Sequence, residues 1–196
     1  MNEHTTIELE NISHVFLDRD GVINRKPPHG GFVTRWEEFE LLPGVDGAIA
    51  KLNHSGRRVI VLTNQRGVAL GLYSLQDLER MHDQLRKLLA QRGARLDEIY
   101  VCPHEDGQCN CRKPLTGLFE QAFRDFPEAR AENSMVVGDS ARDIEAGRRM
   151  GMRTVFLTGH DGAVSGENER ACKLADICVA SLAEFVDRFL SGEYHR

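Results

Sequence analysis

Short apolar runs recur along the chain and alternate with stretches of helical pattern. The runs occupy residues 14–17, 59–63, 99–102, 135–138, 154–157 and 176–179. Their length and their polar or glycine-containing borders are typical of strands buried within a parallel sheet. Strands that alternate with helices imply right-handed crossovers. The pattern therefore predicts an α/β fold, a Rossmann-like three-layer sandwich with a mainly parallel sheet.

Two helices are predicted directly from apolar residues spaced three or four positions apart, at residues 74–92 and 182–190. Ser74 and Asp77 resemble a capping box at the start of the first. Another helix is expected from Asp143 onward. Residues 22–38, 66–73, the cysteine-containing loop after residue 102, and 159–170 lack a regular pattern. Most of these segments follow predicted strands, on the sheet edge where α/β proteins bind ligands.

Composition favours one globular domain. The chain has 196 residues, of which 41% are hydrophobic, enough for one well-buried core and too few for two. We expect a single domain over residues 1–196, with a core at about 13–190 and mobile segments at 1–12 and 191–196. No apolar run approaches the roughly 20 residues of a membrane span. A net charge of −5 gives no general attraction to nucleic acid or anionic membranes, so a cytoplasmic monomer is expected.

Candidate chemistry begins where the first apolar run ends, at Asp18 and Asp20. A carboxylate placed there can attack phosphorus, while a second carboxyl protonates the leaving oxygen and later deprotonates water. The pair alone fits a structural role at least as well, because Asp and Gly are common in turns that follow strands.

Two further strands end in polar residues. Residues 59–62 lead into Thr63, Asn64 and Gln65, whose hydroxyl and turn amides could donate to phosphate oxygens. Residues 135–138 lead into Asp139, with Asp143 four positions later. Asp18 and Asp139 could supply the oxygen ligands that Mg²⁺ prefers, and Asp143 would then orient neighbours or cap its helix.

A cluster of soft metal ligands precedes two cations. Cys102, His104, Cys109 and Cys111 lie within ten residues and could fill a closed, tetrahedral Zn²⁺ site of the structural kind. Arg112 and Lys113 follow Cys111 directly, so a fixed sulfur would also fix the direction of two charges that a phosphoryl group needs. The two remaining cysteines, Cys172 and Cys178, are expected to be ordinary residues in a reducing compartment.

Taken together, these motifs resemble the haloacid dehalogenase superfamily of phosphatases. The four ordered motifs match at residues 18–21, at 63–64, at Lys113, and at 138–139 with Asp143. The cysteine loop followed by Arg112 and Lys113 resembles the branch that holds the heptose bisphosphate phosphatases and the histidinol-phosphatases. Both intervals that carry a cap domain in larger members are short here, so no cap domain is expected.

The resemblance implies a role for each matched position. Asp18 is expected to be the nucleophile, Asp20 the general acid and base, and Thr63 and Lys113 the groups that stabilise the phosphoryl group. Asp18, Asp139 and the backbone carbonyl of Asp20 would hold Mg²⁺. The expected substrate contacts are Asn64, Gln65, Arg66 and Arg112. The expected zinc ligands are Cys102, His104, Cys109 and Cys111.

The substrate is less tightly specified than the reaction. We expect a small phosphorylated metabolite, first a heptose 1,7-bisphosphate and then histidinol phosphate or another sugar phosphate. Arg66 stands where the heptose branch usually has serine, and it could replace a basic residue that this chain lacks a few positions later. A phosphorylated DNA end is disfavoured by the acidic charge balance. A non-catalytic binder of phosphorylated ligands is disfavoured by the complete set of catalytic positions.

Overall fold

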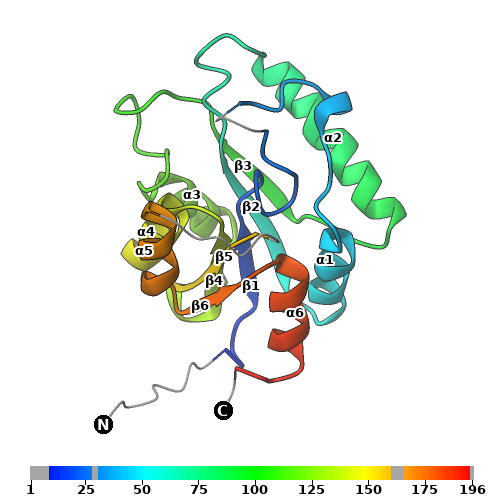
Figure 1. The fold of residues 1–196 in the computed structure, drawn as a ribbon, viewed down its shortest axis with the longest axis vertical. Helices are drawn as coiled ribbons and strands as arrows, with labels where there is room; N and C mark the ends of the chain where they lie inside the picture. Colours follow the sequence, from blue (N-terminus) through cyan, green and yellow to red (C-terminus); the bar gives the residue numbers. More distant parts are fainter. Residues whose placement is uncertain (1–8, 28–30, 160–165, 195–196) are drawn as a thin grey trace.

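Six strands form one parallel sheet in the order β3-β2-β1-β4-β5-β6 (Figure 1). The computed structural model describes residues 9–27, 31–159 and 166–194. The strands are β1 (His14–Leu17), β2 (Arg58–Asn64), β3 (Glu98–Cys102), β4 (Ser134–Gly138), β5 (Arg153–Leu157) and β6 (Ile177–Val179). All six predicted strands are confirmed, with ends that differ by at most one residue.

Helices cover both faces of the sheet and make the predicted three layers (Figure 1). One face carries α1 (Val45–His54), α2 (Leu75–Gln91) and α6 (Leu182–Leu190), and the other carries α3 (Gly117–Asp125), α4 (Ala141–Arg149) and α5 (Glu167–Leu174). Two short 3₁₀ helices, η2 (Trp36–Glu38) and η3 (Ala131–Asn133), complete the elements. In the described part of the chain no separate cap domain is inserted between strands.

Alternating side chains on each strand supply both faces of the core. In β1, Val15 and Leu17 join the cluster under α1 and α6, whereas Phe16 points the other way into the cluster under α3. This is the two-residue period of a strand, and because both faces are covered every position is apolar. The central strands are therefore packed on both faces, and this packing also fixes the backbone of the polar residues at their carboxyl ends.

Local signals placed some helix ends correctly and missed others. The Ser74 hydroxyl accepts a hydrogen bond from the backbone N–H of Asp77 at 3.1 Å, and the Asp77 carboxylate accepts one from the backbone N–H of Ser74 at 2.9 Å, which confirms the predicted capping box. Ser140 and Asp143 cap α4 in the same way, so this helix begins at Ala141 rather than at Asp143. The prediction of irregular structure over 159–170 is wrong at its end, because α5 begins at Glu167; residues 160–165 lie outside the described residues.

The core extends beyond its predicted limits. Leu9 and Ile12 are buried among the core side chains, although mobility was expected for residues 1–12. At the other end, Tyr194 stacks on Phe185 with ring centroids 6.0 Å apart. Both segments contribute apolar side chains that close the α6 face of the sheet. Residues 1–8 and 195–196 lie outside the described part.

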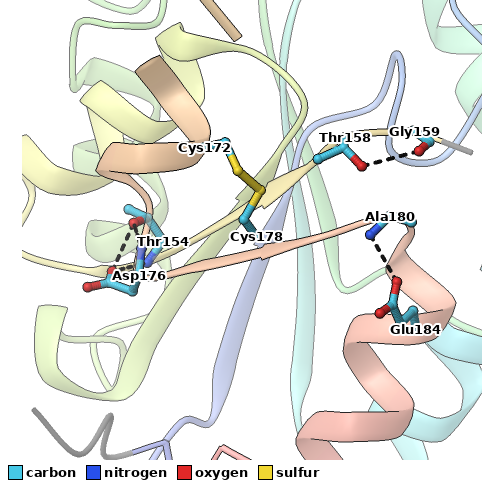
Figure 2. The surroundings of a disulfide bond; sticks show 8 residues. All are labelled: Thr154, Thr158, Gly159, Cys172, Asp176, Cys178, Ala180 and Glu184. Atoms are coloured by element: carbon cyan, nitrogen blue, oxygen red, sulfur yellow. Dashed lines mark hydrogen bonds between the residues drawn. A yellow bond between two sulfur atoms is a disulfide. The ribbon is translucent and has the colours of Figure 1, made fainter. Parts of the chain in front are cut away.

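The prediction that Cys172 and Cys178 are ordinary residues is wrong, because the two form a disulfide between α5 and β6 (Figure 2). The connection between these elements is only a few residues long, so the last turn of α5 lies beside the strand. Asp176 fixes the connection by accepting hydrogen bonds from the backbone N–H and the hydroxyl of Thr154, at 2.7 and 2.8 Å. The remaining three cysteines are free thiols, Cys102 at the end of β3 and Cys109 and Cys111 in the loop that follows.

Candidate active site

The candidate active site lies where the order of the strands reverses direction. From the central strand β1 the chain builds β2 and β3 on one side, then returns to build β4, β5 and β6 on the other. Leu17 is in register with Val61 of β2 and Val137 of β4. Asp18, Thr63 and Asp139 therefore meet at one edge, at the switch point where open α/β sheets bind ligands.

A buried ammonium group connects two of the site carboxylates. Lys113 Nζ lies 2.9 Å from an Asp18 oxygen and 2.5 Å from an Asp143 oxygen, and it donates to the Leu62 carbonyl at 2.6 Å. Burial opposes the charged form of Lys113, but the two carboxylates raise its pKa above the ordinary value. Burial also raises the pKa of Asp18, whereas the contact with Lys113 helps keep the pKa of Asp143 low.

The backbone of Lys113 is positioned by the side chain of Asn64. The side-chain nitrogen of Asn64 donates to the Lys113 carbonyl, and the side-chain oxygen of Asn64 accepts from the Lys113 backbone N–H, both at 3.1 Å. Asn64 is thus committed to protein contacts, although the sequence suggested a substrate contact. This pairing fixes the loop that carries Lys113 to the end of β2.

Asp139 faces a lysine that the sequence did not single out. Lys26 Nζ donates to both carboxylate oxygens of Asp139, at 2.7 and 2.6 Å. Burial raises the pKa of Asp139 to about 7, against the opposing effect of Lys26. The turn after Asp20 permits this approach because Gly21 has φ +91°, and a Cβ there would lie 1.9 Å from an Asp139 oxygen.

Asp20 is held by donors on several sides. Arg19 donates to both carboxylate oxygens, at 2.9 and 3.0 Å, and Asn24 and Gln65 each donate one further bond at 2.8 Å. Burial by itself would raise the pKa of Asp20, but Arg19 and these hydrogen bonds hold it below the ordinary value. In this arrangement Asp20 is a carboxylate, the form that can take a proton from water.

Three carboxylates offer oxygen atoms to a metal ion at the sheet edge. Ligand atoms of Asp18, Asp139 and Asp143 all lie within 4.8 Å of one another, which suits a hard cation such as Mg²⁺. An ammonium group contacts each of the three carboxylates, and Asp143 also accepts from the Ser140 hydroxyl, so Asp143 is the most fully engaged of the three. Among the described residues, the Asp20 carboxylate is not part of this cluster.

The four predicted zinc ligands come together in the loop after β3. Cys102 Sγ lies 3.6 Å from Cys109 Sγ and 3.8 Å from His104 Nδ1, which in turn lies 3.3 Å from Cys111 Sγ. Ligands at the corners of a tetrahedron around Zn²⁺ would be separated by about 3.5–3.8 Å, given bonds of about 2.0–2.3 Å. The spacing fits zinc, and four protein ligands leave no open position for substrate.

A cavity of about 440 Å³ opens above the carboxylates. Its lining includes Asp18, Asp20 and Lys113, together with Arg66, Arg112 and Arg142. Arg66 pairs with Glu105 and Arg112 with Asp106, both acidic residues of the cysteine loop. Arg112 is 7% exposed, and its Nη1 has no hydrogen-bond partner among the described residues. A ligand with two anionic groups would meet several cations in this cavity.

The structure brings together all the predicted catalytic and metal positions, and it adds residues that sequence reasoning missed. The additions are Arg19, Asn24, Lys26 and Tyr73. Arg19 stands between two aspartates in a buried run, which is an unusual place for an arginine and was a usable signal. Lys26 and Tyr73 lie in segments without periodicity, so nothing in the sequence indicated which way their side chains point.

Comparison with known proteins agrees with the geometry. A family model described as HAD-hydrolase-like matches residues 110–185. A D-glycero-alpha-D-manno-heptose-1,7-bisphosphate 7-phosphatase of Mycobacterium bovis is 45% identical over 132 residues, which cover 67% of this chain and 69% of the relative. The corresponding beta-specific protein of Haemophilus ducreyi is 36% identical over 180 residues, covering 88% and 95%.

A solved structure extends the likeness over the whole fold. The D,D-heptose 1,7-bisphosphate phosphatase of B. bronchiseptica, complexed with magnesium and phosphate, matches with a TM-score of 0.79 and 32% identity, over 92% of this chain and 99% of that one. Among the described residues, no helix combines the length and the apolar character needed to cross a membrane.

Proposed function

The chain belongs to the haloacid dehalogenase-like phosphatases, in the family of the heptose-1,7-bisphosphate 7-phosphatases, and on that premise we propose that it removes the 7-phosphate of a heptose 1,7-bisphosphate. The observation that carries the proposal is the contact of Lys113 with Asp18 at the base of the cavity. A carboxylate nucleophile there lies next to the cation that would neutralise the phosphoryl group it attacks.

Asp18 and Asp20 would divide the reaction between them. An Asp18 oxygen attacks phosphorus, and the bond from phosphorus to the sugar oxygen breaks while Asp20 gives that oxygen a proton. The products are the alcohol and an aspartyl-phosphate. Asp20, now a carboxylate, takes a proton from water; the water oxygen attacks phosphorus, and the bond to Asp18 breaks to release phosphate.

Substrate binding would set the protonation state that the first step needs. The donors around Asp20 favour its carboxylate form, as described above. A phosphate dianion bound between Asp18 and Lys113 adds negative charge beside Asp20 and favours the protonated form. After the alcohol leaves, Asp20 is again a carboxylate, the form that can accept the proton of the attacking water in the second step.

We further propose that Asp18 and Asp139, with the backbone carbonyl of Asp20, hold Mg²⁺, and that Cys102, His104, Cys109 and Cys111 hold a structural Zn²⁺. Bound Mg²⁺ would supply positive charge to a phosphoryl oxygen. The related B. bronchiseptica phosphatase is complexed with magnesium and phosphate, which supports this assignment. The zinc loop would hold Arg112 beside the cavity.

The free nitrogen of Arg112 supports a substrate with a second phosphate. A buried guanidinium nitrogen without a partner is costly, and a phosphate oxygen would satisfy it with a charge-assisted hydrogen bond. Arg66, which also lines the cavity, could add a second contact once Glu105 releases it. The cavity volume lies within the usual range for small-molecule sites.

The test measures phosphate release from both anomers of the heptose 1,7-bisphosphate, from histidinol phosphate, from other sugar phosphates and nucleotides, and from a 3′-phosphorylated DNA. We expect the bisphosphate to have the highest kcat/KM. Arg112→Met should lower that value about 10- to 100-fold and leave hydrolysis of a small monophosphate within about threefold. Arg92→Met, which alters an exposed arginine paired with Asp46, is the matched control. A bisphosphate among the poorest substrates would overturn the proposal.

A further inference from the structure

Gln65 has no donor left for a substrate. The sequence placed it among the substrate contacts, and it lines the cavity, but its side chain is 2% exposed. Nε2 donates to Asp20 Oδ2 and to the Thr63 hydroxyl, both at 2.8 Å, and these two bonds use both of its protons. Oε1 accepts from the Tyr73 hydroxyl at 2.6 Å.

We propose that Gln65 is a positioning residue, anchored by Tyr73, that aligns the general acid Asp20 and the phosphoryl-binding Thr63 through one carboxamide. The inference rests on the proposed function, because it concerns how that site works. Asp20 and Thr63 come from different strand ends, β1 and β2. No other described side chain is hydrogen bonded to both.

The chemistry of the partners sets the direction of the amide. An ionised carboxylate only accepts hydrogen bonds, so Nε2 must face Asp20. The same NH₂ group then occupies a lone pair of the Thr63 oxygen, which leaves the Thr63 proton to be donated elsewhere. A phosphoryl group on Asp18 would offer the acceptor. With the amide reversed, Oε1 would instead accept the Thr63 proton and repel the Asp20 carboxylate.

Tyr73 holds the far side of the amide. Its hydroxyl is the donor to Oε1, and its side chain is 7% exposed at the end of the loop that precedes α2. Burial raises the pKa of Tyr73 to about 12, so the hydroxyl keeps its proton at neutral pH. The ring lies against the backbone of Gly67, where a Cβ would be 2.3 Å from Tyr73 Cε1. Close packing against Gly67 therefore fixes the position of the Tyr73 ring.

The test compares two substrates that depend differently on Asp20. An alkyl phosphate needs a proton on its leaving oxygen, whereas p-nitrophenyl phosphate releases a stable phenolate that needs none. Gln65→Met, which keeps the chain length and removes the hydrogen bonds, should lower kcat/KM about 100-fold for the alkyl phosphate and only about tenfold for the nitrophenyl ester. KM should stay within about threefold for both.

Two tyrosine variants provide the second arm. Tyr73→Phe should change kcat/KM in the same direction, by about three- to tenfold for the alkyl phosphate and less for the aryl ester. Tyr100→Phe is the matched control, because that buried hydroxyl also donates a hydrogen bond, to Asp125 at 2.8 Å, but away from the site. If Gln65→Met does not fold, Tyr73→Phe against Tyr100→Phe decides by the same criterion.

Three outcomes would overturn the inference. Equal losses for the two substrates would assign Gln65 a purely structural role, and a raised KM with unchanged kcat would make it a substrate contact. Identical behaviour of Tyr73→Phe and Tyr100→Phe would remove Tyr73 from the network. Failure of the proposed function is distinguishable: a protein without phosphatase activity would hydrolyse neither ester even when unmodified, whereas a different preferred substrate would leave both activities of the unmodified protein in place.

Discussion

Two clusters of metal-binding type lie side by side in this molecule and differ in every physical respect. At the sheet edge, Asp18, Asp139 and Asp143 offer hard oxygen ligands, and the ammonium groups of Lys26 and Lys113 already contact them. In the loop after β3, the four zinc-type ligands face one another without an intervening cation.

This difference indicates which cluster can bind and release its ligands. An ammonium group in contact with a carboxylate can move aside for a metal or a phosphate, so the carboxylate cluster suits binding and release. A closed set of three sulfurs and one imidazole satisfies its metal completely and suits a permanent ion. The two are joined by the chain itself, because Lys113 lies two residues after Cys111.

The largest effect should come from Asp18→Asn. Removing the nucleophile should lower kcat for the substrate at least about a thousandfold, while zinc content and Tm stay close to those of the unmodified protein. Phosphate-release assays and metal analysis check this. Asp187→Asn, which alters an exposed aspartate paired with Lys51, should leave kcat, zinc content and Tm unchanged. Loss of zinc in Asp18→Asn would show that the clusters are not independent.

Cys111→Ser, unlike Asp18→Asn, should mainly lower the stability of the folded protein. Structural zinc couples to folding, so a loss of about 3 kcal/mol or more should lower Tm by roughly 6–12 °C and release zinc. Activity should fall because Arg112 and Lys113 are less well held. The double variant Cys172→Ser, Cys178→Ser removes the disulfide outside the loop and should retain zinc. Undiminished Tm and zinc content in Cys111→Ser would contradict the structural assignment.

Acid should destabilise the protein through a histidine that belongs to neither cluster. Burial and the neighbouring Arg19 lower the pKa of His82 to about 3 from its usual 6.5, and Arg19 Nη1 donates to its Nε2 at 3.3 Å. Below about pH 6.5 the unfolded chain binds a proton that the folded chain excludes, so this stabilisation is present above that pH and is lost as pH falls toward 3. The loss between pH 7.5 and 5.5 should be about 1.4 kcal/mol.

Urea unfolding at the two pH values, with the protein and its His82→Gln variant, measures this contribution. Glutamine keeps an acceptor for Arg19 and cannot be protonated, so the variant should lose about 1.4 kcal/mol less on acidification. An identical loss in both proteins would assign the acid sensitivity to other groups, with the thiolates of the cysteine loop as the first candidates.

The smallest expected effect tests whether Lys26 competes with a cation for Asp139. Lys26→Met removes the ammonium group that contacts both Asp139 oxygens, so the apparent affinity for Mn²⁺, followed by electron paramagnetic resonance, should rise about three- to tenfold. Lys51→Met removes a lysine from an exposed pair with Asp187 and serves as the control. Equal affinities in the two variants would mean that Lys26 does not oppose metal binding.

The sequence predicted the parts of the fold that repeat and the parts of the site that stand at strand ends. All six strands were predicted because a strand buried on both faces is a continuous apolar run, which can be recognised without knowing its neighbours in the fold. Asp18, Thr63 and Asp139 follow such strands, so parallel geometry alone brings them together. The cysteine loop was found from the ligand types and their spacing.

What the sequence missed depends on side-chain direction and on contacts distant in the chain. Nothing local shows that Tyr73 turns toward Gln65, or that Lys26 reaches across to Asp139. The pairing of Cys172 with Cys178 was missed for a similar reason, because it follows from how α5 returns along β6. Gln65 was assigned to the substrate because a polar residue at a strand end can face either a ligand or its protein neighbours.

The contact between Lys26 and Asp139 has a consequence for the order in which ligands arrive. Counted formally, the cluster of Asp18, Asp139 and Asp143 with the ammonium groups of Lys26 and Lys113 carries one net negative charge, which opposes a phosphate dianion at this cluster. A bound divalent cation reverses the sign to one net positive charge and attracts the dianion. Inorganic phosphate should therefore inhibit more strongly when Mg²⁺ is present, as a titration of each ligand with and without the other would reveal.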